Sequence, residues 1–538
     1  MSEIRDKVLY SKEPYTLDPG QERIIFKLLD LIQAELRETG DRDWILDCTT
    51  ENSVRISHIL GRSIKVASGL TRLGFKPGDT LHTAYSTCLD FYWPIFGAWL
   101  CGGVVSVGDP GLSASNLKSQ IQDTHAKIIV CEVESCSKFL EANQSLLSAE
   151  QASNILVLDL EPWQPIPEGT SSFRSLYEDQ GDQCPDRASL PGYIPKEPVV
   201  IHWTSGTTGS PKGVVMSQEY LHFQMRQSKL PEKTIGLASN TFFHAGSFLL
   251  SLDGGIRNKF SIHFIQPKHT TVESIFRFIE KYKPMFFMCG ANDFVQLASS
   301  DLAKFDLSSV NVIMPAGNKI AKSAATRMKE KFPNLKFVYQ FYGSTEVGGV
   351  SGSFTVENMG ALREGVQTYI RDQKTGEKLG VGEVGEIMAK TPTMMIHYLN
   401  RQDESRELLD EEGFAHMGDL GYYDENGILH YKERIKEMIK IGNYWIGPAE
   451  FEDNLENIPG VVEAVVWQSM NKETDNYYIH GAVTLQASSG LNPEKILELA
   501  NKDVEVKRRI DGTIHIINNM PHNPQGKKLR RTVRQMFE

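Results

Sequence analysis

The sequence predicts an α/β protein made of a large N-terminal domain and a small C-terminal domain. Helical patterns alternate with short β-rich runs, and 538 residues are enough for about three folding units. Hydrophobic residues make up 40% of the chain and charged residues 23%, as in globular proteins. Because alternating helices and strands favour parallel sheets, we expect mixed, mostly parallel sheets flanked by helices over residues 1–432. A small, mobile α/β domain is expected over residues 433–538.

The first segments show this alternation clearly. Residues Val54–Leu73 have the periodicity of an amphipathic helix that stops at Gly74. A turn at Lys76–Asp79 precedes the strand-like run Thr80–Tyr85. The uncharged stretch Phe91–Gly108 is long enough to raise the question of a membrane span, but it contains one proline and four glycines. We therefore expect a buried helix that leads into a buried strand, and no transmembrane segment.

The charge balance and the cysteines exclude several classes of protein. The chain has 57 Lys and Arg against 68 Asp and Glu, a net charge of -11, so no positive surplus favours nucleic acid. Its seven cysteines include no C-x2-C pair, which argues against a disulfide framework or a zinc site. The first residues lack the apolar segment of a secretory signal, and Gln535–Glu538 is not an S-K-L-type address. A cytoplasmic location is expected.

A loop rich in glycine and hydroxyl groups follows a short apolar strand at Val199–Trp203. Small residues let backbone N–H groups approach an anion, hydroxyls add donors, and Lys212 adds a positive charge, so the loop resembles a phosphate cradle. A Walker A loop is disfavoured because Pro211 precedes the lysine and Gly213 follows it. A flexible surface loop is the alternative. The candidate phosphate-binding residues are Thr204, Ser205, Gly206, Thr207, Thr208, Gly209 and Lys212.

A second glycine pattern is not expected to bind a dinucleotide. Gly380–Gly385 satisfies G-x-G-x-x-G, but a turn at Asp372–Glu377 precedes it instead of a buried strand, and no clear helix follows.

The last part of the chain predicts a separate small domain. A turn at Asp424–Gly427 leads into a short strand, and the charged run Glu433–Glu437 is typical of a linker or hinge. A helix is expected from about Pro448 to Asn457, with strands at Val461–Trp467 and Tyr478–Thr484. About 100 residues of this kind are enough for a small α/β domain.

Five motifs follow one another along the chain: the loop Thr204–Gly213, Tyr342–Glu346, Met417–Asp419, Glu433–Lys436 and Pro521–Lys527. Together they resemble the adenylate-forming superfamily of acyl-CoA synthetases, nonribosomal peptide adenylation domains and beetle luciferases. The resemblance covers about Ile56 to Leu529 and is strongest to the 4-coumarate-CoA ligase and luciferase-like branch. It implies that a carboxylate and ATP form an acyl-adenylate and pyrophosphate, and that a thiol, usually that of CoA, then takes the acyl group. ATP, Mg²⁺ and CoA are the expected cofactors and co-substrates.

The resemblance assigns a role to each residue of the second motif. Tyr342, followed by Gly343, is expected to stack on adenine, Thr345 to contact the α-phosphate, and Glu346 to bind Mg²⁺. The phosphate loop is expected to hold the β- and γ-phosphates. Gly317 would approach adenine, although its neighbours Asn318 and Lys319 depart from the family pattern.

The later motifs supply the ribose contact, the hinge and the adenylation lysine. Asp419 is expected to accept hydrogen bonds from the ribose hydroxyls, with a turn aspartate as the alternative. By the same resemblance, Arg434 would contact ribose or phosphate and Lys436 would mark the hinge. Lys527 would serve adenylation, unless it belongs only to a basic tail. Met417 and Glu433 replace the family's usual Thr and Asp.

Two features concern the acid and the second step. His244, in Thr241–Gly246, matches the family's motif beside the carboxylate pocket and would orient the acyl group, while a core histidine is the alternative. The branch's second-step lysine aligns with Gly442, and Lys440 is the nearest cation. The departure argues against a luciferase-type oxidation and leaves the efficiency of thioester formation open.

The sequence therefore predicts an intracellular acid-thiol ligase, most simply a medium- or long-chain fatty acyl-CoA synthetase. An aromatic acid-CoA ligase of the 4-coumarate type, a luciferase-like monooxygenase and a catalytically weakened nucleotide-binding relative are the alternatives. The resemblance also leaves a peroxisomal location open. The oligomeric state is not predicted.

Overall fold

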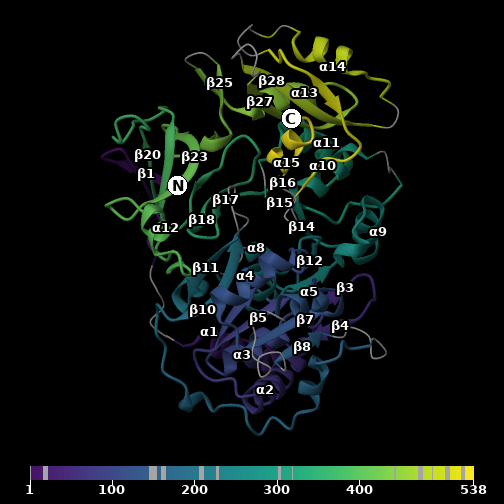
Figure 1. The fold of residues 1–538 in the computed structure, drawn as a ribbon, viewed down its shortest axis with the longest axis vertical. Coiled ribbons are helices and arrows are strands. Elements are labelled where there is room, and N and C mark those ends of the chain that lie inside the picture. The colour runs from purple at the N-terminus through teal and green to yellow at the C-terminus, as the bar shows by residue number, and fades with distance from the viewer. Residues whose placement is uncertain are drawn as a thin grey trace.

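A computed structural model gives the arrangement of the chain (Figure 1). It describes residues 2–15, 22–143, 154–158, 165–204, 211–225, 230–300, 304–317, 319–441, 444–470, 477–486, 489–502, 504, 509–522 and 528–538, without the side chains of residues 141–143, 440, 444 and 445.

An eight-stranded sheet forms the lower part of the molecule in Figure 1. Its strand order is β22-β11-β10-β6-β5-β7-β8-β9, and all pairs from β10 to β9 are parallel. The strands β10 and β11 form an antiparallel hairpin, and β22 pairs antiparallel with β11. The strand bounds are β5 Thr80–Ala84, β6 Val104–Val107, β7 Ile128–Glu132, β8 Ile155–Leu158, β9 Ser171–Ser172, β10 Pro198–Thr204, β11 Lys212–Ser217 and β22 His397–Tyr398.

The helices of this part confirm the predicted alternation. The predicted helix appears as α2 (Ile56–Arg72), and Gly74 closes it with φ +79°, a conformation that glycine adopts without steric penalty. The uncharged stretch splits into the fully buried α3 (Trp93–Leu100) and β6, as expected. None of the described helices is long and apolar enough to cross a membrane. The other helices here are α1 Ile24–Glu38, α4 Ala114–Thr124, α5 Val133–Asn143, α7 Gln218–Gln224 and α12 Gln402–Glu407.

Helix α3 is buried because aromatic side chains surround it. Trp44 stacks on Phe96 with a centroid distance of 5.7 Å and lies 5.1 Å from the ring of Tyr92. All three rings are fully buried. Burying one such ring removes enough apolar area from water to stabilise the fold by about 1.5 to 3 kcal/mol, so this cluster contributes strongly to the stability of the region around α3.

A seven-stranded sheet follows, with the order β16-β15-β14-β12-β13-β3-β4. All of its pairs are parallel except β3 with β4. Its strands are β3 Asp43–Asp47, β4 Ser53–Arg55, β12 Ile235–Ala238, β13 Ser261–Phe264, β14 Phe286–Gly290, β15 Val312–Ala316 and β16 Phe337–Val338. Its helices are α8 Ala245–Leu249, the π-helix η3 Leu250–Arg257, the 3-10 turn η4 Pro267–His269, α9 Val272–Tyr282, α10 Ala291–Ser299 and α11 Lys322–Lys331.

A third, antiparallel sheet carries the N-terminal residues and lies at the upper left of Figure 1. Its order is β1-β2-β20-β21-β23-β24. The segment Gly380–Gly385 leads into β21, whose two neighbours are both antiparallel, whereas a dinucleotide fingerprint lies in a parallel βαβ unit. The strands are β1 Ser2–Arg5, β2 Val8–Ser11, β20 Gln367–Arg371, β21 Gly385–Lys390, β23 Ala415–Tyr423 and β24 Leu429–Arg434, beside the smaller sheet β17 Gln340–Ser344, β18 Gly348–Ser353 and β19 Ala361–Leu362.

The C-terminal segment forms its own sheet and core. The predicted helix and strands appear as α13 (Pro448–Glu456), β27 (Val461–Met470) and β28 (Tyr477–Leu485). This segment lies above α10 in Figure 1, and the side chain of Gln486 donates to the carbonyl of Ser299 at 3.5 Å. Its other elements are η5 Ile435–Glu437, β25 Ile439–Ile441, β26 Tyr444–Ile446, α14 Pro493–Ala500, β29 Ile514–Ile516 and α15 Arg530–Gln535.

The described part of the connector between β8 and β10, residues 165–197, is rich in proline and largely irregular. It contains β9 and two short 3-10 helices, η1 (Phe173–Glu178) and η2 (Arg187–Ser189). It is fastened to α1 by the ion pair of Arg23 with Glu197 at 2.8 Å.

Candidate active site

Three of the predicted nucleotide contacts, Tyr342, Asp419 and Arg434, meet in one cluster. Asp419 on β23 lies directly opposite Arg434 on β24 in the strand register. The guanidinium Nε of Arg434 is 3.0 Å from Asp419 Oδ1, and the phenol of Tyr342 donates to Asp419 Oδ2 at 2.8 Å. Asp419 is only 3% exposed, so both of its oxygens are held by partners inside the protein.

Burial and charge fix the protonation of this cluster. Burial raises the pKa of Tyr342 well above its usual value, and the nearby carboxylate of Asp419 raises it further. Tyr342 therefore stays a neutral hydrogen-bond donor at physiological pH. Burial acts to lower the pKa of Arg434, but the combined charges of Asp419 and the neighbouring acidic groups raise it by more, and the guanidinium stays charged. The cluster presents one paired carboxylate, one cation and one aromatic ring.

Gly418 places Asp419 in this position. Its φ of +66° is one that glycine adopts readily, and the guanidinium of Arg434 donates to the carbonyl of Met417 at 3.2 Å. The replacement of the family's Thr by Met417 therefore leaves the geometry of the Gly-Asp pair in place, because the contact uses the backbone.

A second cluster joins Lys212 to Glu346 through Tyr398. Lys212 at the start of β11 forms an ion pair with Glu404 on α12, and its ammonium group lies 4.8 Å from the ring centre of Tyr398. The phenol of Tyr398 donates to Glu346 Oε1 at 2.9 Å. Burial, followed by the charge of Glu346, raises the pKa of Tyr398, which therefore remains a neutral donor.

Sequence reasoning missed Tyr398 and Glu404. Neither belongs to any of the five motifs, and Tyr398 reaches Lys212 and Glu346 because β22 pairs with β11 across nearly 200 residues. An aromatic residue in a short β-rich run after Met394 was the available signal, and it is too common to single out.

The segment between the two clusters is held tightly. The phenol of Tyr220 donates to the carbonyl of Thr345 at 3.2 Å, and the N–H of Met395 donates to the carbonyl of Glu346 at 2.8 Å. A Cβ on Gly343 would overlap the carbonyl oxygen of Gly348, so only glycine fits between β17 and β18. Gly317, which follows β15, has φ +103°.

The phosphate loop is described at its two ends. Thr204 closes β10 and Lys212 opens β11, and the two are paired in the hairpin, with the Thr204 hydroxyl donating to the carbonyl of Lys212 at 3.4 Å. The predicted phosphate contacts Ser205, Gly206, Thr207, Thr208 and Gly209 lie outside the described residues.

His244 precedes α8 and is partly buried. Burial lowers its pKa to about 4, so the ring is neutral at physiological pH. Gly246 and Met288 lie near His244. If Gly246 carried a Cβ, that atom would be 3.5 Å from His244 Nδ1 and 3.7 Å from Met288 Cε. Burial and the nearby His244 lower the pKa of His202 to about 3. Sequence reasoning did not select His202, which lies inside the strand before the loop.

The hinge and the C-terminal motif are described in part. Lys436 is exposed in the 3-10 turn η5, and Glu433 is buried, accepting hydrogen bonds from the N–H groups of Arg434 at 3.0 Å and Ala449 at 3.1 Å. Glu433, the longer replacement for Asp, therefore ties the hinge to α13. Lys527, Asn318 and Gly442 lie outside the described residues, as does the side chain of Lys440.

The fold and the two clusters define an adenylate-forming enzyme. The chain belongs to the AMP-binding enzyme family, whose sequence profile matches residues 34–399. The predicted superfamily membership and α/β fold are thus confirmed.

The chain is similar to a curated relative and to solved structures over most of its length. The chain is 27% identical to a 4-coumarate–CoA ligase of Pinus taeda over 521 residues, which cover 92% of each protein. It superposes on the crystal structure of the anthranilate CoA ligase AuaEII in complex with anthranoyl-AMP with a TM-score of 0.80 at 18% identity, covering 95% of this chain and 96% of that one. The luciferase-like enzyme of the nonluminescent mealworm Zophobas morio gives a TM-score of 0.67 at 22% identity, covering 79% of this chain and 99% of that one. The two structural matches establish the shared fold.

Proposed function

We propose that this protein is an AMP-forming acid-CoA ligase, which joins a carboxylic acid to CoA through an acyl-adenylate. The observation that carries the proposal is the way Tyr342 and Glu346 connect the two clusters. Tyr342 contacts the Asp419–Arg434 pair, and Glu346, four residues later, contacts Tyr398 beside Lys212. One short segment thus links a site suited to adenine and ribose with a site suited to phosphates.

In the first step a carboxylate oxygen of the acid attacks the α-phosphorus of ATP, and pyrophosphate leaves. Negative charge gathers on the phosphoryl oxygens, so preorganised donors and cations lower the barrier. Lys212 and the loop from Thr204 would hold the β- and γ-phosphates, and Thr345 and Lys527 would act at the α-phosphate. The pairing of Asp419 and the ring of Tyr342 would orient the ribose and the base.

The residues near the phosphates suit Mg²⁺. Magnesium prefers one or two carboxylates together with phosphate oxygens, and Glu346 offers one half-buried carboxylate oriented by the phenol of Tyr398. Mg²⁺, when bound, neutralises charge on the transferring phosphates.

In the second step the thiol sulfur of CoA attacks the acyl carbon, the bond from that carbon to the phosphate oxygen breaks, and AMP leaves. We propose that residues 433–538 rotate about Lys436 between the two steps, which removes Lys527 from the site. The exposure of Lys436 and the separate hydrophobic core of the C-terminal segment support this division at residue 432.

The residues near His244 support an acid with an uncharged body. His244 is neutral, and Phe243 and Met288 are buried hydrophobic neighbours of the segment. A medium- or long-chain fatty acid is the first candidate. An aromatic acid of the coumarate class is the second, and the names of the 4-coumarate–CoA ligases that resemble the chain favour it.

The test is the release of pyrophosphate from Mg-ATP with a panel of fatty, cinnamic and amino acids, each with and without CoA, followed by the mass of the product. An acyl-CoA from one class of acid supports the proposal and names the substrate. Pyrophosphate release without a thioester would point to another acceptor, and light emission with oxygen would point to a luciferase-like reaction. A protein that binds ATP but turns over no acid would contradict the proposal.

A further inference from the structure

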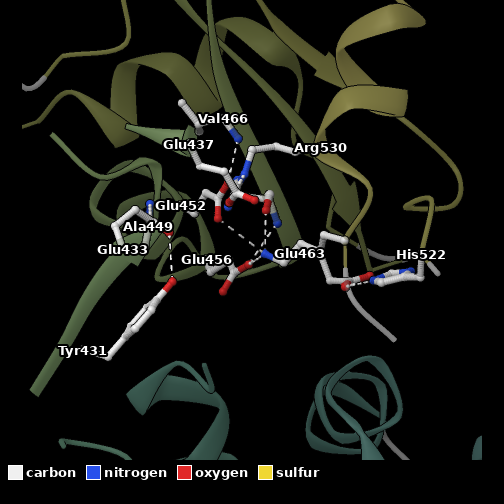
Figure 2. Close-up of polar contacts among 12 residues, drawn as sticks. Tyr431, Glu433, Glu437, Ala449, Glu452, Glu456, Glu463, Val466, His522 and Arg530 are labelled. Atoms are coloured by element: carbon white, nitrogen blue, oxygen red, sulfur yellow. Dashed lines mark hydrogen bonds and ion pairs between the residues drawn. The ribbon is translucent and has the colours of Figure 1, made fainter. Parts of the chain in front are cut away.

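Three buried carboxylates line one region of the C-terminal segment. Glu452 and Glu456 belong to α13 and Glu463 to β27, and their side chains are 7%, 10% and 6% exposed. Figure 2 shows their carboxyl groups close to Arg530 and His522. A buried carboxylate without a partner strongly destabilises the folded state, so the fold requires the cations that pair with these groups.

The partners come from both ends of residues 523–527, the segment that contains Lys527. After the segment, the ammonium of Lys528 lies 2.9 Å from Glu456 Oε1 and donates to the carbonyl of Ala464 at 2.7 Å. Before it, His522 Nε2 lies 2.9 Å from Glu463 Oε1. His522 and Lys528 also pair as an antiparallel β-bridge. Both ends of the segment are therefore held next to each other by separate buried carboxylates.

The same network reaches the hinge. The guanidinium of Arg530 contacts Glu452, and its Nε lies 3.1 Å from Oε2 of Glu437. Glu437 is in the 3-10 turn η5, directly after Lys436. Figure 2 shows Glu437, Glu452 and Arg530 close together. A continuous set of ion pairs thus connects the hinge with the residues that follow Lys527.

Lys528 is the centre of this arrangement. Burial acts to lower its pKa, but the carboxylates of Glu456, Glu463 and Asp453 together raise it by more. The ammonium therefore stays charged and donates its hydrogen bonds to groups of the protein. A flexible lysine at the surface would donate them to water instead.

We propose that Lys528 and Glu456 position Lys527 for adenylation, and that Arg530 and Glu437 join this anchor to the hinge. The inference rests on the proposed function, because it assigns Lys527 to the adenylation step. Lys528 is bonded directly to Lys527, so fixing its side chain fixes the point from which Lys527 extends. Lys528 and Glu456 act through Lys527 and are positioning residues. A misplacement of about 1 Å lowers a rate by about 100-fold.

Lys528→Met, Lys528→Arg and the double variant Glu456→Gln with Lys528→Met test the proposal. The double variant removes both charges together, and its glutamine oxygen still accepts from the N–H of Ala464, as Glu456 does at 3.0 Å. It should therefore fold even where Lys528→Met alone is unstable. Arg531→Met is the matched control, since Arg531 is an exposed cation one residue beyond Arg530.

The variants are compared in single-turnover adenylation, in thioester formation from supplied acyl-adenylate, and in hydrogen exchange of residues 519–529 without substrate. Lys528→Met and the double variant should slow adenylation about 10- to 100-fold with little change in the KM for ATP. Thioester formation should stay within about two-fold, exchange at Leu529 should rise, and Lys528→Arg should restore most of the rate.

Two outcomes would show that the network has only a structural role and would overturn the proposal. One is recovery of the adenylation rate in the double variant, and the other is an equal loss of rate in adenylation and in thioester formation. Unchanged exchange at residues 519–529 would also overturn it. The exchange measurement needs no turnover, so it tests the anchor formed by Lys528 and Glu456 even if the protein activates no acid. A parent protein that activates no acid would contradict the proposed function instead.

Discussion

The phenol of Tyr342 donates a 2.8 Å hydrogen bond to the carboxylate of Asp419, which lies 77 residues further along the chain. Tyr342 lies on β17 and Asp419 on β23, and these two strands belong to different sheets. Their contact, completed by Arg434, holds the carboxylate in one orientation before any nucleotide is bound. Preorganisation of this kind reduces the ordering that binding requires.

Asp419→Asn should weaken ATP binding about 10- to 100-fold, because hydrogen bonds to a charged group contribute about 1.5 to 3 kcal/mol. The change also leaves Arg434 without its carboxylate partner. Calorimetric titration with ATP measures the effect. Affinity equal to that of the parent would remove Asp419 from the ribose site.

Tyr398→Phe should lower the rate of adenylation or the affinity for Mg²⁺ about 10- to 100-fold, as expected when the partner of a metal ligand is removed. The ring that lies near Lys212 is retained, so only the hydrogen bond to Glu346 is lost. Initial rates over a range of Mg²⁺ concentrations separate the two effects. Tyr10→Phe on β2 is the control, and a parent-like Mg²⁺ dependence of Tyr398→Phe would argue against a role of Glu346 in metal binding.

Lys527→Ala should slow adenylate formation by about two to four orders of magnitude, since a positioned cation stabilises charge that develops in the transition state. The affinity for ATP should change little, and thioester formation from supplied acyl-adenylate should remain. Rapid-quench measurement of pyrophosphate provides the rate. Equal adenylation rates in the variant and the parent would show that Lys527 has no part in this step.

His82→Asn should make the protein less sensitive to acid. His82 is fully buried, its Nδ1 lies 2.9 Å from Ser106 Oγ, and burial lowers its pKa from 6.5 to about 3. A histidine with a lowered pKa stabilises the fold above pH 6.5, and the contribution is lost as the pH falls, because the unfolded chain then binds the proton more readily.

Between pH 7 and pH 5 this one group accounts for a loss of about 2 kcal/mol in the free energy of unfolding. The variant should lose correspondingly less stability over this interval. Urea denaturation at the two pH values measures the difference, and an identical loss in the variant and the parent would contradict the assignment.

Two glycines in packed helices should respond in opposite ways to alanine. Gly61 in α2 is exposed and a Cβ there would meet no atom within 4 Å, so Gly61→Ala should stabilise the fold by about 1 kcal/mol. In α3 a Cβ on Gly97 would lie 2.5 Å from Val66 Cγ1 on α2, so Gly97→Ala should destabilise it by about 1 to 3 kcal/mol. Thermal melting of the two variants compares them directly. Equal effects would mean that α2 and α3 pack differently.

Local sequence predicted the helices and strands better than it predicted which side chains from distant segments contact one another. The bounds of α2, β5 and α13 follow from periodicity and from stop signals such as Gly74, which act within a few residues. Tyr342, Asp419 and Arg434 were identified because each lies in a motif. Tyr398 was not, because its contacts with Lys212 and Glu346 depend on the pairing of β22 with β11, which no local pattern specifies.

The same reason explains why the buried network around Lys528 was not anticipated. A run of basic residues reads as a solvated tail, and only the packing of α13 and β27 supplies the carboxylates that bury its lysine. The pairing of the first strands with β20 was likewise beyond local reasoning.

That pairing has a consequence for biosynthesis. Val8 lies opposite Tyr369, so the hairpin β1–β2 leaves the ribosome long before β20 exists to receive it. Strand pairs this distant in sequence form slowly, because the chain must close a long loop before any contact is gained. The sheet in question also carries Asp419 and Arg434. The proposed nucleotide site can therefore be completed only after Arg434 has been synthesised, and the earliest strands must remain without their partner until β20 follows.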